Sequence, residues 1–460
     1  MADIKNSPEP VRRDERIKLG EKIAFGIVNI GNIPIQALLS GFLLIFYTDV
    51  AGLNPAAVAT MFLVMRVFDG LNDPIMGFVI DHLPRTKMGR FRSYLLLGTV
   101  ICCINFILVW FGPVWAPAGK LAIAYISYLF LGITFDFMDI PLNSMLPAIT
   151  DSAHERNVLS SVKRIGMMTG STLFGMAAPL ILANAVNRLN GFYALIFSGV
   201  AVILVFSIIG VMGIRERVEP VVDEKYKLKD IVPILTCPPV LVTLIVAIIG
   251  GISTIQQRTS NMYFCTYVLD NRLDVMTFIS LFGMAEILPC MGPVVFLANR
   301  FGKKPVFVMG IIISGLVPLF RFFAVTNIPL IYITTLLAGV GTGFFKTLLL
   351  GISADNVDYV EYTRGQRAEG ALSSLVSFVV KAAMGIGGAI PGYVLAATGY
   401  VANQTQTETA KMGIIMNNIL IPSILVLISG LVFGLGYGIN REKLAQITAS
   451  LREQRAAKAR

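Results

Sequence analysis

Residues 66–77 read RVFDGLNDPIMG, and they place two acids inside an apolar stretch. This combination is the best guide to the fold of the chain. The sequence AAVATMFLVM precedes them and FVI follows them. Asp69 and Asp73 are four residues apart, so on a helix they share one face. An ionisable residue inside a lipid-spanning helix is costly and is by default a sign of function. The stretch therefore indicates a membrane helix whose acids bind a ligand.

The whole chain has the composition of a membrane protein. Its 460 residues are 55% hydrophobic and only 14% charged, and the mean hydropathy is +0.72. Apolar runs of about 20 residues recur, each long enough to cross a hydrocarbon core of about 30 Å. Lipid cannot satisfy a bare backbone, so the spans must be helices. We predict an all-α polytopic membrane protein with twelve transmembrane helices, at residues 22–47, 57–80, 93–113, 121–147, 160–186, 190–213, 233–266, 275–298, 305–324, 328–352, 371–397 and 412–438.

The loops divide these spans into two six-helix halves. RERVEPVVDEKYKLKD, the longest polar stretch inside the chain, separates the sixth span from the seventh. Short basic loops, DHLPRTKMGRFR and ANRFGKKP, follow the second and the eighth spans. Repeated halves are typical of secondary transporters, whose substrate site lies between them. We predict a cytoplasmic N-tail over 1–21, an N-terminal half over 22–213, a cytoplasmic linker over 214–232, a C-terminal half over 233–440 and a basic cytoplasmic C-tail over 441–460.

The basic residues indicate the orientation of the chain. Segments on the side of the N-terminus hold 26 lysines and arginines, whereas the loops on the other side hold 4. Positive loops stay in the cytoplasm, so we expect an integral plasma (inner) membrane protein with both termini cytoplasmic. The net charge of +10 then serves topology and contact with anionic lipid, and we expect no nucleic-acid partner.

Motifs of other function classes are missing from the sequence. The five cysteines lie in apolar segments or at their ends and form no CxxC pair, so they indicate neither a metal site nor a disulfide framework. No Walker A signature, catalytic triad or metal motif is present. We therefore expect neither an enzyme nor a cofactor.

Twelve residues with charged side chains fall in the interior of the predicted spans, and they are the candidate functional residues. Four carboxylates in one half cannot all stay ionised without cations. A bound Na⁺ or H⁺ would relieve the repulsion, and oxygen ligands suit Na⁺. Static ion pairs that lock helices together are the alternative, a stronger one for the arginines of spans 2, 7 and 9. The twelve are Arg66, Asp69, Asp73, Asp136, Asp139, Lys163, Arg164, Arg258, Glu286, Arg321, Lys346 and Lys381.

Several stretches in the same order resemble a known family. They are FYTDVAGL (46–53), RVFDGLNDPIMG (66–77), KMGRFRSYLLLG (87–98), FDFMDIPLNSMLPAIT (135–150) and VDYVEYTRGQRAEG (357–370). Over about residues 20–440 the chain resembles the glycoside–pentoside–hexuronide:cation symporters, a branch of the major facilitator superfamily. The resemblance implies the major facilitator fold and uptake of a sugar together with Na⁺, Li⁺ or H⁺.

The same resemblance implies roles for individual residues. Asp69 and Asp73, with Asn72 between them, match the cation site and are the ligands of Na⁺ if sodium is the coupling ion. Lys381 matches a lysine of that site. For the sugar, the matching residues are Asp139 and Arg164.

The chain also departs from the family pattern at several of these positions. Ile33 replaces a sugar-binding aspartate, whereas Asn143 and Lys346 take the places of tryptophans and are expected to line the sugar site. Asp136 replaces a threonine of the cation site, so we expect it to join that site and weigh proton coupling equally with sodium coupling. Lys346 could pair with the carboxylate of an anionic sugar such as a hexuronide, or it could neutralise Glu286 or Asp136. The role of Glu286, as a helix lock or as a substrate contact, stays open.

These observations favour a cation-coupled sugar symporter that works by alternating access. Its partners are a small sugar, a monovalent cation and membrane lipid. We expect Arg90 in the first basic loop, and Arg367 and Glu369 in the loop between spans 10 and 11, to act in gating or helix locking. A proton-coupled exporter, a uniporter and a sugar-binding sensor of the same fold are the alternatives.

Overall fold

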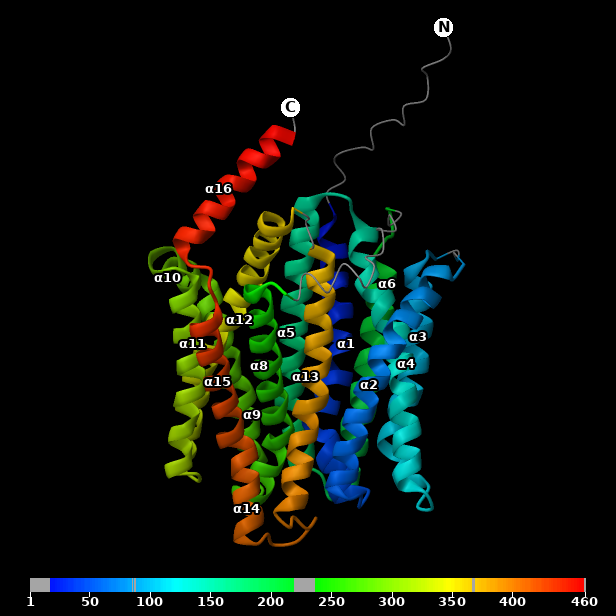
Figure 1. The fold of residues 1–460 in the computed structure, drawn as a ribbon. Helices are drawn as coiled ribbons and strands as arrows, with labels where there is room; N and C mark the ends of the chain where they lie inside the picture. Colours follow the sequence, from blue (N-terminus) through cyan, green and yellow to red (C-terminus); the bar gives the residue numbers. More distant parts are fainter. Residues whose placement is uncertain (1–16, 85, 87, 219–235, 366–368, 459–460) are drawn as a thin grey trace.

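A computed structural model of the protein describes residues 17–84, 86, 88–218, 236–365 and 369–458. Within this part every regular element is helical, apart from a single isolated bridge between Thr86 and Gly89. The all-α prediction is confirmed. The long helices run side by side in one bundle, and the C-terminal helix projects from one end of it (Figure 1).

Six long helices make up the N-terminal half, with one π-helical segment. They are α1 (Leu19–Ile45), η1 (Phe46–Val50), α2 (Pro55–His82), α3 (Phe91–Trp115), α4 (Lys120–Ile149), α5 (Ala153–Ala183) and α6 (Arg188–Gly213).

The C-terminal half has more interrupted helices. They are α8 (Pro238–Tyr263), η2 (Phe264–Val268), α9 (Leu273–Gly283), η3 (Met284–Met291), α10 (Pro293–Phe301), α11 (Lys303–Leu319), η4 (Phe320–Phe323), α12 (Ile328–Arg364), α13 (Glu369–Ala397), α14 (Glu408–Ile415), η5 (Met416–Leu420), α15 (Ile421–Gly436) and α16 (Arg441–Lys458).

The described residues support the predicted number of spans. Ten helices are long and apolar enough to cross a membrane, and the bent segment from α9 to α10 adds an eleventh. Helix α2 is the twelfth; its 28 residues are long enough to span a bilayer, and it lies within the bundle (Figure 1). Its hydropathy is lowered by the charged residues of the stretch 66–77.

Two predicted spans differ most from the observed helices. The eighth, predicted as one helix over 275–298, is bent by 47° before Pro293. Gly292 at the bend has φ 137°, which favours glycine, and Pro289 and Pro293 lack the N–H of a continuous helix. The tenth, predicted to end at residue 352, continues as α12 to Arg364, so residues 353–364 of the predicted loop between spans 10 and 11 are helical.

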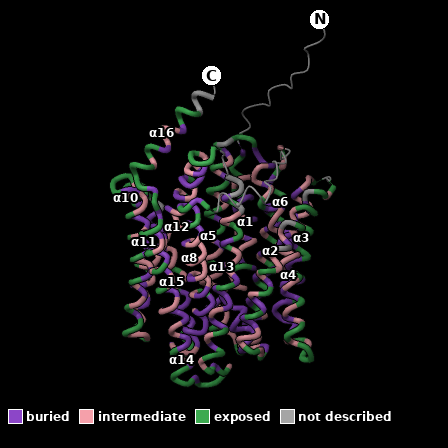
Figure 2. The backbone as a smooth tube through the Cα atoms, viewed as in Figure 1, coloured by how far each residue is buried: buried purple, intermediate pink, exposed green. Residues whose placement is uncertain are grey.

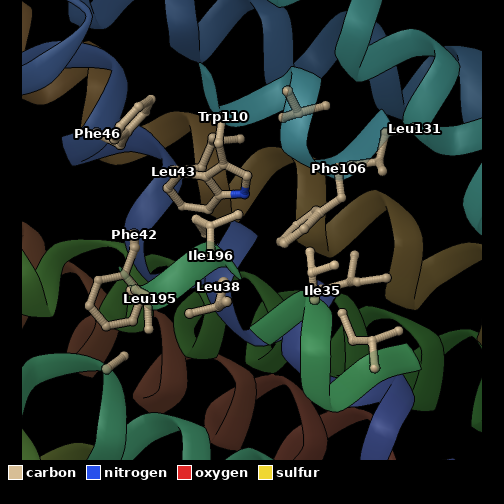
Figure 3. Packing of buried hydrophobic residues seen from close by; sticks show 14 of the residues in the cluster. Ile35, Leu38, Phe42, Leu43, Phe46, Phe106, Trp110, Leu131, Leu195 and Ile196 are labelled. Atoms are coloured by element: carbon tan, nitrogen blue, oxygen red, sulfur yellow. The ribbon is translucent and has the colours of Figure 1, made fainter. Parts of the chain in front are cut away.

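The bundle is closed at one end. Figure 2 shows the buried residues concentrated toward the end opposite α16, which we call the closed end. There one hydrophobic cluster includes residues of both halves, from Trp110 and Phe46 to Tyr263 and Tyr400. Figure 3 shows its N-terminal part, where Trp110 lies near Phe46 and Phe106. Two further clusters lie wholly within the C-terminal half.

Asp49 joins the two halves at the closed end. The residue lies in η1 with 8% of its surface exposed, and its carboxylate pairs with Arg188 of the same half. The hydroxyls of Tyr267 and Tyr400, both in the C-terminal half, donate to it at 2.5 Å. The hydroxyl of Thr48 donates to it as well, at 2.8 Å. A buried carboxylate with four donors is well satisfied, so this contact holds the halves together.

Candidate functional site

The two acids of the opening stretch lie on α2 and have different partners. Asp69 accepts a hydrogen bond from Arg66, one helical turn earlier, at 2.8 Å. Asp69 also lies against Gly132 of α4, because a Cβ added to that glycine would lie 2.5 Å from Oδ1. The guanidinium of Arg66 is 3.5 Å from the hydroxyl of Tyr128 on α4. The interface of α2 and α4 therefore fixes the first acid.

Asp73 forms an ion pair between the two halves. Its Oδ2 accepts a hydrogen bond from Nζ of Lys381, which α13 contributes from the C-terminal half. Its other oxygen, Oδ1, is buried and has no hydrogen-bond partner among the described residues. A carboxylate oxygen can accept more than one bond, so Asp73 offers a free position to a cation or a proton.

Asp136 adds a third carboxylate from α4. Asn72 Nδ2 donates to it at 2.8 Å, and only 9% of Asp136 is exposed. Asp69, Arg66 and Lys381 line the same cavity as Asp136, which has a volume of about 150 Å³. Three of the predicted cation-site residues, Asp69, Asp136 and Lys381, thus line one small cavity. The other two, Asn72 and Asp73, are joined to it by their hydrogen bonds with Asp136 and Lys381.

The cluster carries one more negative charge than positive charge. Its carboxylates belong to Asp69, Asp73 and Asp136, and its cations to Arg66 and Lys381. Unbalanced charge is costly in a low-dielectric interior. One monovalent cation would balance the cluster. Over the described part of the chain, no three His, Cys, Asp or Glu side chains lie close enough together to form a metal site. In this structure Asp69 pairs with Arg66 and Asp73 pairs with Lys381.

A second network surrounds Asp139. Asn32 of α1 donates to one carboxylate oxygen at 2.7 Å, and Asn143 donates to the other at 2.7 Å. The amide oxygen of Asn143 accepts a hydrogen bond from Lys163 of α5. Asp139 lines the small cavity, so the predicted sugar-binding acid lies next to the cation cluster. Ile33 lines a second, larger cavity.

Arg164 lies apart from this network. It is exposed, and it has no partner among the residues that the structure describes. Its neighbour Lys163, which the sequence marked only as an interior charge, reaches Asn143 instead. The interior lysine and the family-matched arginine therefore have different surroundings in this conformation.

Lys346 of α12 lines the larger cavity, whose wall contains residues of both halves. Its Nζ donates to Glu286 Oε2 at 2.8 Å, so of the two acids considered as its protein partner it contacts Glu286. The cavity has a volume of about 490 Å³ and meets the small one at shared wall residues. These shared residues are Gln36, Ser40, Ile255 and Met384.

The predicted gate residues are described only in part. The backbone N–H of Arg90 donates to Glu216 at 2.8 Å, which places it at the start of α3. Arg367 lies outside the described residues. Glu369 begins α13, and its side chain is not described. In the second basic loop Lys303 pairs with Asp355 at 2.7 Å.

Sequence reasoning missed residues whose importance depends on packing. Asn32 and Gly132 are small residues without charge, and no local pattern distinguishes them. Their contacts with Asp139 and Asp69 join helices far apart in the sequence. Only an alignment of polar positions on facing helices could have indicated them.

Comparisons with known proteins show which family the chain resembles. A family model described as "MFS/sugar transport protein" matches residues 24–441. The chain is 31% identical to the isoprimeverose transporter of Lactiplantibacillus pentosus, over 90% of this chain and 88% of that protein. It is 29% identical to the glucuronide carrier protein homolog of Escherichia coli (strain K12), over 93% and 94%.

Solved structures agree on the fold. The crystal structure of a D-xylose–proton symporter covers 91% of this chain and 98% of its own, with a TM-score of 0.63 and 15% identity. The crystal structure of the nucleoside transporter NupG covers 90% and 98% with a TM-score of 0.61 and 12% identity. At these identities the likeness establishes the architecture alone.

Proposed function

Since the chain belongs to the MFS/sugar transport family, as its resemblance to the glycoside–pentoside–hexuronide:cation symporters predicted, we propose that it couples sugar uptake to a monovalent cation. It is an integral membrane transporter and not an enzyme. The proposed coupling ion is Na⁺ or H⁺, with Li⁺ as a substitute for Na⁺. The proposed location is the plasma (inner) membrane, with both termini in the cytoplasm.

One observation carries the coupling proposal: the Asp73–Lys381 ion pair joins the halves and belongs to a cluster that lacks one positive charge. A cation at the free oxygen of Asp73 would balance the cluster and compete with Lys381. The strength of a contact between the halves would then depend on cation binding. This dependence is what a symporter requires, because cation and sugar must each tighten the binding of the other by the same factor.

The sugar site is proposed to lie between the halves, beside this cluster. Asp139 and Asn143 accept and donate hydrogen bonds there, which suits sugar hydroxyls. Arg164 is proposed to turn toward the sugar when it binds. Lys346 is the contribution of the C-terminal half.

Alternating access is supported by where the halves touch. If the positive loops are cytoplasmic, the closed end faces outward and this conformation faces inward. Asp49 and its tyrosine partners form the outer gate. Arg90, Arg367 and Glu369, which belong to segments at the α16 end, are proposed to act when that end closes.

The test replaces Asp73 by asparagine and measures uptake of labelled glycosides, pentosides and uronides into vesicles. Na⁺ and H⁺ gradients are imposed independently. We expect Asp73→Asn to abolish accumulation above equilibrium for the sugar that the wild type concentrates, because the amide neither holds a proton nor balances a cation.

Asp274→Asn is the matched control, since Asp274 pairs with Arg272 on the exposed surface, 2.7 Å away, at the closed end. It should accumulate the sugar like the wild type. Undiminished accumulation by Asp73→Asn would remove the proposed cation site. Uptake by the wild type that ignores both gradients would indicate a uniporter.

A further inference from the structure

We propose that the transported sugar carries an anionic group, a carboxylate or a sulfonate, and that Arg321 and Arg258 bind it in the larger cavity. The inference rests on the proposed transport function and names its substrate class.

Arg321 is a buried cation whose described partners are neutral. Only 4% of its surface is exposed. Its Nε donates to Thr334 at 2.6 Å and its Nη2 donates to Thr335 at 2.8 Å. Within the described residues it pairs with no carboxylate, and Nη1 makes no hydrogen bond. Arginine cannot lose its proton in a protein, so the fold keeps a positive charge here that an anion would balance.

Arg258 places a second unbalanced charge in the same cavity. It lines the wall and is exposed within it, and no described residue pairs with it. The other ionisable wall residues are Lys346 and Glu286, which neutralise each other at 2.8 Å. The two arginines therefore remain in excess. A guanidinium matches the geometry of an oxyanion and binds it with paired hydrogen bonds.

The cavity also suits the rest of a sugar. Its volume of about 490 Å³ lies within the usual range of about 300–1,000 Å³ for small-molecule sites. Ser253, Gln257 and Asn261 supply neutral hydrogen-bonding groups on its wall. The cavity meets the acidic cluster at Gln36 and Ser40. An anionic sugar and a cation would thus occupy neighbouring sites of opposite charge.

The experiment measures uptake by the full-length protein in vesicles with three labelled probes. Methyl glucuronide carries a carboxylate, methyl sulfoquinovoside carries a sulfonate, and methyl glucoside is the neutral counterpart. We expect at least one acidic sugar to enter at least tenfold faster than the neutral one at equal low concentration. Arg321→Gln should reduce this preference at least tenfold.

Arg258→Gln is a second variant, chosen because an exposed side chain in a cavity is not needed for folding. It should reduce the preference in the same direction. Arg272→Gln, on the exposed surface at the closed end, is the matched control and should keep the wild-type preference. Preference for only one of the two acidic sugars supports the proposal and identifies the anionic group.

Two outcomes overturn the inference alone. One is gradient-driven uptake of the neutral sugar with no preference for either acidic one. The other is an equal loss of acidic and neutral uptake in both variants, which would give the arginines a purely structural role. If no glycoside, pentoside or uronide enters under any gradient, the proposed function itself fails as well.

Discussion

Gly132 determines where the carboxylate of Asp69 can lie. The glycine has no side chain on the face of α4 that meets α2, and an added Cβ would lie 2.5 Å from Asp69 Oδ1. Real Cβ atoms do not approach other atoms this closely, so any larger residue must displace the carboxylate. Displacement would weaken its 2.8 Å hydrogen bond with Arg66. The contact therefore gives a way to disturb the cation cluster without removing a charge.

We expect Gly132→Ala to weaken the apparent affinity for the coupling cation about tenfold while the protein still folds. Losing one hydrogen bond to a charged group costs about 1.5–3 kcal/mol at most. Because the carboxylate lies at the end of a side chain, it can move aside without disrupting the fold. The measurement is the apparent affinity for the coupling cation in vesicle uptake.

Gly77→Ala, on α2, is the control for this substitution. A Cβ there meets nothing within 4 Å, so its cation affinity should equal that of the wild type. Equal cation affinities in Gly132→Ala and Gly77→Ala would show that Asp69 does not contribute to cation binding.

At this scale the sequence reveals charges but not their partners. A carboxylate in an apolar stretch is conspicuous, so the sequence was enough to predict Asp69 and Asp73 as functional residues. Lys381 could then be predicted as their counter-charge. Lys346 had a possible substrate carboxylate and two protein acids as partners, and the structure pairs it with Glu286. Such a choice depends on how helices face one another, which the local pattern does not contain.

At the scale of the element, the structure differs from the prediction mainly where helices end or break. The apolar runs predicted most of the spans, but they merged α9 and α10 into one helix because both are apolar. The break follows from Gly292 and the neighbouring prolines. It lies next to η3, which carries Glu286. A broken helix that contributes a charged residue to a cavity is typical of transporters.

The start of α3 is capped by a residue from another segment. Glu216, just after α6, accepts hydrogen bonds from the backbone N–H groups of Arg90, Phe91 and Arg92 at 2.8–2.9 Å. The first N–H groups of a helix have no partner within it, and the positive end of the helix favours an anion. The carboxylate thus fixes α3 to the end of α6.

We expect Glu216→Ala to lower the free energy of unfolding by about 1–2 kcal/mol, as for loss of other N-terminal caps. The measurement is thermal unfolding of the purified protein in detergent. The control is Glu408→Ala, because Glu408 is an exposed acid with only a 3.1 Å contact to Lys411. Surface pairs of this kind contribute little. Equal unfolding midpoints for the two variants would contradict the capping role.

For the whole molecule, the sequence predicted two halves but not which end is closed. The linker and the two basic loops indicated the repeat. A transporter sequence must allow both the inward-facing and the outward-facing arrangement, so no local pattern can select one of them. The structure selects one through contacts between residues far apart in the chain, such as Asp49 with Tyr400. The loop predicted to gate the α16 end is mostly helix, because α12 continues to Arg364.

We expect Asp49→Asn to open the closed end, because the amide has no charge for Arg188 and one oxygen fewer to accept from Tyr267 and Tyr400. A loss of about 1.4 kcal/mol changes the ratio of the two conformations tenfold. Spin labels at Ala118→Cys and Thr405→Cys, both exposed at this end, should then report a second, longer distance. In an Asp274→Asn control the shorter distance should dominate. If Asp49→Asn gives only the short spin-label distance, removing the carboxylate has left the balance of conformations unchanged. The hydrophobic cluster alone then keeps this end closed, and Asp49 does not act as a gate.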